Sequence, residues 1–260
     1  MSKLKKNISF LSSKLSIIWT LAKKNITLYI KSGPVLIFGL MFPFFLTLSW
    51  VIGRNVSSVQ IFIGIVAMTS FFTSTAISPV VLPIETRENS LERIISSPVS
   101  LLEIIFGILI ASFLYSLFIT SAITIIFIIL LELQFYSLIS IFIIFLAIIL
   151  LGVIGSLLGI LISANPTEKT SDVMVTMNIL KFPILFISGI FIPFELLPSS
   201  ALFISLFSPL TFMVDMLRFA VGGNNFFPIL IDLFALICWI ILLLIINYFT
   251  HKKTILKRFS

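Results

Sequence analysis

Charged side chains that could form ion pairs or bind a partner gather between Glu85 and Glu103. The chain has 17 basic and 10 acidic residues. Six of them fall in this short segment: Glu85, Arg87, Glu88, Glu92, Arg93 and Glu103. The stretches on either side, 55–84 and 104–131, carry no charge. A polar segment between two apolar stretches is expected at a membrane surface, where it offers a charged handle to a partner in water.

The sequence predicts no catalysis by this chain. No G-x-x-x-x-G-K-[ST] phosphate-binding loop occurs in it, so we expect it to bind no ATP or Mg itself. Its single histidine, His251, and single cysteine, Cys238, cannot supply a ligand cluster for zinc or a nucleophile with an adjacent base. We therefore expect no catalytic residue, no metal site and no bound cofactor.

Composition predicts an all-α integral membrane protein. Hydrophobic residues make up 59% of the chain and charged residues 10%, whereas soluble domains carry about 45–50% and about 25%. Several uncharged runs exceed the roughly 20 residues that cross a bilayer as a helix. They predict six transmembrane helices, at 33–52, 59–83, 103–131, 138–163, 173–192 and 226–249.

Basic residues indicate the orientation of these spans. Of the 17 lysines and arginines, most fall on one side of the predicted membrane: Lys3, Lys5, Lys6, Lys14, Lys23, Lys24, Lys31, Arg87, Arg93, Lys169, Lys252, Lys253, Lys257 and Arg258. Positive charge marks the cytoplasmic side, so we expect a multi-pass protein of the plasma membrane with both termini in the cytoplasm. The net charge of +7 is then explained by topology and by attraction to anionic membrane lipid, and it does not indicate nucleic acid.

The remaining segments complete the predicted organisation. Residues 1–32 form the cytoplasmic N-terminus and an amphipathic helix lying in the membrane interface, because apolar residues recur there every three or four positions. Residues 33–250 form one six-span membrane domain, with a cytoplasmic loop at 84–102 and an outer region at 193–223. Residues 251–260 form a basic cytoplasmic tail.

Residues 199–221 are apolar enough to resemble a further span. A full crossing would place the C-terminal basic cluster outside, and Asp215 and Arg218 lie within the segment. Pro193, Pro198 and Pro209 also interrupt this part of the chain. We expect two short re-entrant helices that dip into the outer leaflet and return. The alternative is a pair of interfacial helices lying flat on the membrane.

The charged loop itself has helix signals. Asn89 with Glu92 three residues later is typical of a capped helix start. A short helix at 90–96 would place Leu91 on an apolar face that fits a groove on a partner. Ser100 could cap the third span. The alternative is a solvated turn between ordinary membrane-flanking charges.

These residues resemble the permeases of type-2 ATP-binding cassette (ABC) exporters. In that family a Glu-rich segment, a Leu-Glu pair and a Ser/Thr-Pro-Val/Leu step join the second and third spans, as in ETRENSLERIISSPVS at 85–100. A second resemblance lies in FISGIFIPFELLP at 186–198 and SPLTFMVDMLRFAVGG at 208–223. The family usually has Gly-Thr where this chain has Asn89-Ser90.

The resemblance implies a mechanism with several partners. Two permease subunits, identical or related, form the pathway, and each docks on a separate cytoplasmic P-loop ATPase that binds ATP and Mg. The loop at 84–102 would couple the two proteins through Glu85, Arg87, Glu88, Leu91, Glu92 and Arg93. The outer gate would include Pro193, Pro198, Pro209, Asp215 and Arg218.

Two other classes of function remain open at this point. An ion-driven secondary transporter would need coordinating carboxylates or broken helices near the bilayer midplane, and a membrane scaffold would move nothing. For an exporter, 28 Phe against three Trp and four Tyr favour a drug or lipid-like cargo over a polysaccharide.

Overall fold

The computed structural model describes residues 2–30, 39, 41–133, 137–192 and 194–258. Every regular element in these ranges is a helix, as composition predicts. In chain order they are α1 (Ser2–Ile30), α3 (Phe42–Val51), α4 (Ser58–Ile77), α5 (Val81–Arg87), α6 (Ser90–Ile95), α7 (Leu101–Leu130), α8 (Leu138–Ile162), α9 (Thr170–Ile187), the 3-10 turn η2 (Phe194–Leu196), α10 (Ser199–Ser205), α11 (Pro209–Ala220), α12 (Ile229–Thr254) and the 3-10 turn η3 (Ile255–Arg258).

Five segments in the described part of the chain are long and apolar enough to cross a membrane. They are Ser58–Arg87, which joins α4 and α5, and the helices α7, α8, α9 and α12. These segments confirm the expected spans from the second to the sixth. The first expected span, 33–52, lies partly outside the described residues, and its described part contains the short apolar helix α3.

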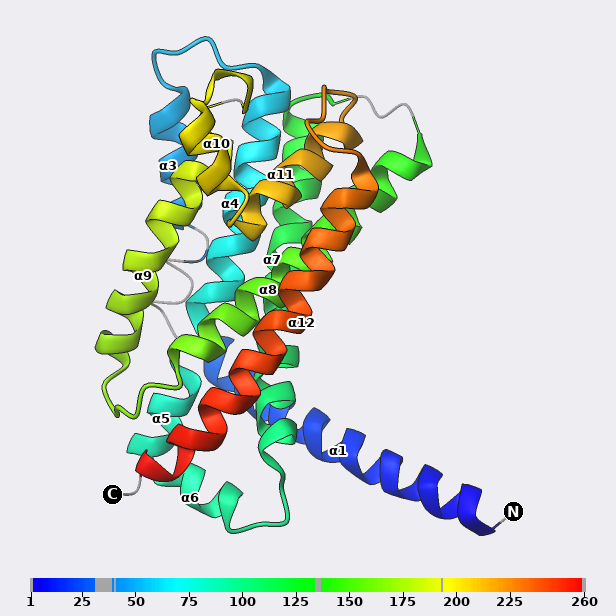
Figure 1. Ribbon diagram of the computed structural model, residues 1–260, viewed down its shortest axis with the longest axis vertical. Coiled ribbons are helices and arrows are strands. Elements are labelled where there is room, and N and C mark those ends of the chain that lie inside the picture. The colour runs from blue at the N-terminus through cyan, green and yellow to red at the C-terminus, as the bar shows by residue number, and fades with distance from the viewer. Residues whose placement is uncertain (1, 31–38, 40, 134–136, 193, 259–260) are drawn as a thin grey trace.

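Helix α4 lies at the centre of the bundle. The share of its apolar stretch that is buried is 94%, against 17% for α7 and for α12. It packs against α3, α7, α8, α9 and α11, which surround it (Figure 1). The outer helices therefore present apolar side chains to lipid, whereas α4 forms the core.

Hydroxyl groups join α4 to α7 and α8. The side chains of Ser112 and Ser116 on α7 donate to the carbonyl oxygens of Ser74 and Ser70 on α4, at 2.8 and 3.2 Å. Ser156 on α8 donates in turn to the hydroxyl of Ser112 at 2.9 Å. Lipid tails are as apolar as leucine side chains, so hydrogen bonds between helices and close packing hold such a bundle together.

Glycines bring the backbone of α8 close to α4. A Cβ atom at Gly159 would lie 2.8 Å from Cδ of Pro79 and 2.9 Å from Cβ of Ser78. One at Gly155 would lie 2.9 Å from Cβ of Ser74. Real side chains do not approach this closely, so small residues are required along this contact.

The region before the last span forms two short helices, as expected. Helices α10 and α11 meet at a bend of 97°. Eleven residues of α11 are buried, and it packs against α4, α8 and α12. Its burial within the bundle favours the re-entrant arrangement over a helix that lies flat on the surface. Most of α10 is exposed.

The N-terminal helix α1 leaves the base of the bundle at an angle (Figure 1). It packs against α7, where Gly107 leaves room for Leu21: a Cβ atom on Gly107 would lie 2.7 Å from Cβ of Leu21. Leu15 and Trp19 are exposed, which suits the headgroup region of a membrane. The expected amphipathic helix therefore forms, and part of its apolar face is used for contact with the bundle.

We expect Gly159→Ala to destabilise the protein, because the added methyl group would push α8 away from Ser78 and Pro79. Overpacking of this kind costs about 1–3 kcal/mol, which should appear as a lower midpoint of thermal unfolding in detergent. Gly152→Ala is the matched control, since a Cβ atom there meets Phe113 at an ordinary 3.4 Å. Equal midpoints for the two variants would contradict the close α4–α8 contact.

Candidate functional site

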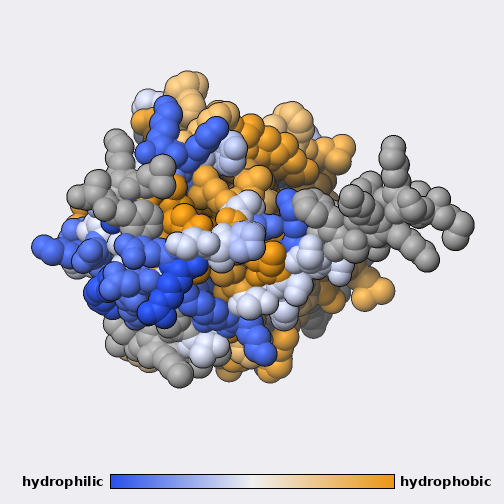
Figure 2. Space-filling view, turned by 90° about the horizontal axis from the view of Figure 1, so that it is seen from below, coloured by the Kyte–Doolittle hydropathy of each residue, from blue (hydrophilic) through white to orange (hydrophobic). Residues whose placement is uncertain are grey.

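The charged segment lies at the end of the central helix. Helices α4 and α5 form one stretch of 30 residues. A helix of that length is about 45 Å long, which exceeds the hydrocarbon core of about 30 Å. Helices α5 and α6 therefore reach the end of the bundle where the C-terminus also lies (Figure 1). Figure 2, which views the molecule from that end, shows hydrophilic side chains gathered on part of this face beside hydrophobic ones.

The structure divides the six predicted coupling residues into two groups. Arg87, Glu88, Glu92 and Arg93 are exposed to solvent, where they could contact another protein. Glu85 and Leu91 are buried, and Leu91 belongs to the hydrophobic core. The hairpin formed by α5 and α6 therefore carries both side chains that can contact a partner and side chains that pack inside the bundle.

Glu85 is held by a cation from the N-terminal helix. Nζ of Lys24 donates to Oε1 of Glu85 at 2.9 Å, and this contact joins α1 to α5. The side chain of Glu85 is 3% exposed and that of Lys24 is 38% exposed. A buried carboxylate needs such a counter-charge, because it has lost its hydration. Sequence analysis assigned Lys24 only to the basic side of the membrane and missed this pairing.

One of the two predicted helix caps is wrong. Helix α6 begins at Ser90 as expected, but the side chain of Asn89 makes no cap hydrogen bond. Asn89 instead has a φ of 54° and forms the turn between α5 and α6, a conformation that asparagine tolerates better than most residues. The cap at Ser100 is confirmed, since its hydroxyl accepts from the amide of Glu103 and its own amide donates to the Glu103 carboxylate.

The predicted outer residues fasten α11 to neighbouring turns. The carboxylate of Asp215 accepts hydrogen bonds from the backbone amides of Phe226 and Phe227 at 2.8 and 2.7 Å. The guanidinium of Arg218 donates to the carbonyl oxygen of Gly189 at 2.9 Å. It also lies 4.8 Å from the ring centroid of Phe194. These contacts give both charged residues a structural role at this end of the bundle.

The two predicted prolines that the structure describes, Pro198 and Pro209, lie at the starts of α10 and α11. Pro198 precedes α10, and Pro209 occupies the first turn of α11. A proline is tolerated there because the first turn needs no backbone donor. Pro193 lies outside the described residues.

Two charged residues of the spans are buried inside the bundle. Lys181 on α9 is 3% exposed, and its amine lies 5.2 Å from the ring centroid of Phe72. Asp232, in the first turn of α12, is fully buried. Hydrophobicity along a sequence gives depth in the membrane but not the direction in which a side chain faces, so these positions could not be predicted.

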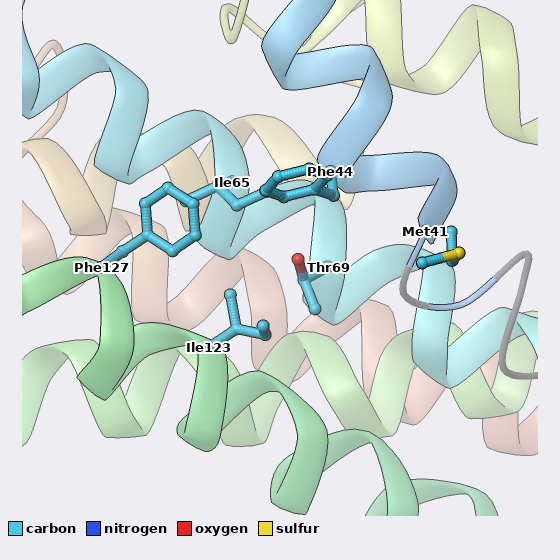
Figure 3. Close-up of a pocket in the computed structure, with 6 residues that line it drawn as sticks. All are labelled: Met41, Phe44, Ile65, Thr69, Ile123 and Phe127. Atoms are coloured by element: carbon cyan, nitrogen blue, oxygen red, sulfur yellow. The ribbon is translucent and has the colours of Figure 1, made fainter. Parts of the chain in front are cut away.

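An apolar pocket opens between α3, α4 and α7. Its volume is about 250 Å³, and its walls are Met41, Phe44, Ile65, Thr69, Ile123 and Phe127. Figure 3 shows these side chains around a common space, with the hydroxyl of Thr69 as the polar atom among them. A second hollow shares Phe44 and Phe127 with this pocket. The pocket suits an apolar group.

The described residues hold no group of three or more His, Cys, Asp or Glu side chains that could bind a metal ion. His251, placed in the basic tail by the sequence, is buried near the end of α12, with Nδ1 2.9 Å from the carbonyl oxygen of Asn247. The exposed Cys238 lies on the same helix.

Comparison with known proteins identifies the family. No curated protein matches the chain. The family model described as ABC-2 type transporter matches residues 17–221, a range that includes the α5–α6 hairpin and the α10–α11 pair. The chain belongs to the ABC-2 type transporter family and is a transmembrane component of an ABC transporter.

Proposed function

We propose that the chain is the permease subunit of an ATP-driven exporter, coupled to a separate P-loop ATPase that binds ATP and Mg. Two permease subunits, identical or related, would enclose the pathway. Both termini and the α5–α6 hairpin would face the cytoplasm across the plasma membrane. The observation that carries this proposal is the exposed charged group on α5–α6, joined directly to the buried central helix α4.

In this mechanism the ATPase contacts Arg87, Glu88, Glu92 and Arg93, whose side chains are exposed. Leu91 anchors α6 in the core, so the hairpin follows its partner without unfolding. Closure of the ATPase dimer then tilts α5 and α4 as one body. Such rocking about an interface is a common form of domain motion.

Helix α1 would carry the same movement to the periphery. Lys24 ties α1 to Glu85 on α5, and the close contact at Gly107 ties α1 to α7. A tilt of α5 therefore moves α1 and α7 together. At the opposite end of the bundle, α10 and α11 form the outer gate, held by the contacts of Asp215 and Arg218.

The cargo would be a drug or lipid-like molecule. The pocket between α3, α4 and α7 has apolar walls that suit such a group. A glycan would instead need a pathway lined with hydrogen-bonding groups. An ion-driven carrier would transport without an ATPase and a scaffold would not transport. Co-purification of a P-loop ATPase therefore identifies an exporter, and a transport assay separates the other two classes.

Glu88→Lys together with Glu92→Lys should uncouple ATP hydrolysis from transport. Both carboxylates are exposed, so the reversal changes the contact surface and leaves the packed bundle intact. We expect normal membrane insertion but loss of cargo-stimulated ATP hydrolysis, measured on the purified complex in lipid.

The control for this experiment is Glu132→Lys, at an exposed position after α7, at the end of the bundle opposite the α5–α6 hairpin. It should keep cargo-stimulated hydrolysis. Unchanged stimulation in the double variant would count against the coupling role of α5–α6.

A charge exchange tests the contact between α1 and α5. Lys24→Glu or Glu85→Lys alone places like charges together at a site where the position of Glu85 is buried and that of Lys24 is partly exposed. Because each single variant leaves a buried charge at position 85 without its opposite partner, it should unfold at a lower temperature and lose coupling. The double exchange, Lys24→Glu with Glu85→Lys, should recover much of both. Failure of the double exchange to improve on either single variant would refute the pairing.

A further inference from the structure

The last residue of the described chain, Arg258, forms a tie between two turns that are far apart in sequence. It lies in the turn η3, which follows α12 directly. Its Nη1 donates to Oγ1 of Thr86 at 3.2 Å and to the carbonyl oxygen of Thr167 at 3.3 Å. Its Nη2 donates to the carbonyl oxygens of Asn165, at 2.9 Å, and of Ser163. One guanidinium therefore contacts α5 and the turn between α8 and α9.

The chemistry of these acceptors explains why an arginine is needed. Ser163 is the C-cap of α8, and carbonyl groups at the end of a helix carry partial negative charge. The guanidinium is planar and offers five donors in a fixed arrangement. Burial lowers the pKa of Arg258 to about 10, so the group stays charged at neutral pH. A lysine could not serve acceptors in two separate segments with the same geometry.

The acceptor on α5 lies next to a residue that binds a second cation. Thr86 is adjacent in sequence to Glu85, which Lys24 holds. Successive residues of α5 therefore bind a cation from the N-terminal helix and a cation from the C-terminal turn. Beyond the α8–α9 turn, α9 begins at Thr170 and packs against both α10 and α11.

We propose that Arg258 is a positioning residue that locks the α8–α9 turn to α5, so that movement of α5 reaches α9 and, through α9, the α10–α11 pair. This inference rests on the proposed coupling of the chain to an ATPase. It assigns the C-terminal turn a part in transmission, whereas the sequence alone explained its charges by membrane topology.

The test follows the α10–α11 pair directly and needs no knowledge of the cargo. Cys238, which is exposed, is replaced by Ser, and the exposed Phe203 on α10 is replaced by Cys. The complex with its ATPase is reconstituted in lipid. The rate at which an impermeant maleimide labels the new cysteine is then measured with and without a non-hydrolysable ATP analogue.

With Arg258 present, the analogue should change the labelling rate. With Arg258→Ala, the ratio of the two rates should move toward one, because the route from α5 through α9 is lost while the direct packing of α4 against α11 remains. The ATPase should still co-purify and hydrolyse ATP. Lys253→Ala, which removes an exposed charge from the same end of the chain, should keep the full ratio, and Arg258→Lys should restore only part of it.

The outcomes separate this inference from the proposal on which it rests. An unchanged ratio in Arg258→Ala would overturn the role of Arg258 and leave the coupled permease intact. A chain with Arg258 that neither binds an ATPase nor responds to the analogue would overturn both. If Arg258→Ala does not assemble, Thr86→Val removes only the acceptor on α5 and should lower the ratio in the same way, and an unchanged ratio there would refute the tie.

Discussion

The burial of α4 is the constraint on which the rest of this structure depends. A helix surrounded by other helices within a membrane has no water to bind its polar groups, so its hydroxyls must find partners inside the protein. The hydroxyls of Thr73, Ser74 and Thr75 donate to carbonyl oxygens one turn earlier in α4. Ser112 and Ser116 of α7 donate to two carbonyl oxygens of α4, and Ser156 of α8 donates to Ser112. The glycines of α8 let the backbones of α8 and α4 approach closely enough to maintain these contacts. The bundle therefore moves as packed units and does not deform continuously.

The charged α5–α6 hairpin is attached directly to this central helix. Because α5 continues the central helix, a force on α5–α6 acts on the axis of the bundle and not on a loose loop. Glu85 and Thr86 lie at the junction and are held by Lys24 and Arg258, which come from the two ends of the chain. The exposed residues of α5–α6 that would contact a partner therefore lie close in sequence to Glu85 and Thr86. The contacts of these two residues with Lys24 and Arg258 would transmit the partner's movement.

Composition and spacing were enough to predict the helical membrane fold, five of the spans and the paired short helices before the last span. They also predicted the short helix from Ser90 and the cap at Ser100, because both depend on neighbours in sequence. They could not predict that Lys24 pairs with Glu85 or that Arg258 reaches Thr86, since these partners are brought together only by tertiary packing. For the same reason Lys181 and Asp232 could be placed along the membrane normal but not assigned to an inward face.

The most direct test of this account is a photo-crosslink from the exposed hairpin. A photoreactive residue at Arg93, which is exposed on α6, should form an adduct with a P-loop ATPase in cells that express the complex. The same residue at Leu138, which is exposed at the start of α8, should form no such adduct. An adduct from position 138, or none from position 93 while the ATPase co-purifies, would contradict the claim that this hairpin receives the force of ATP hydrolysis.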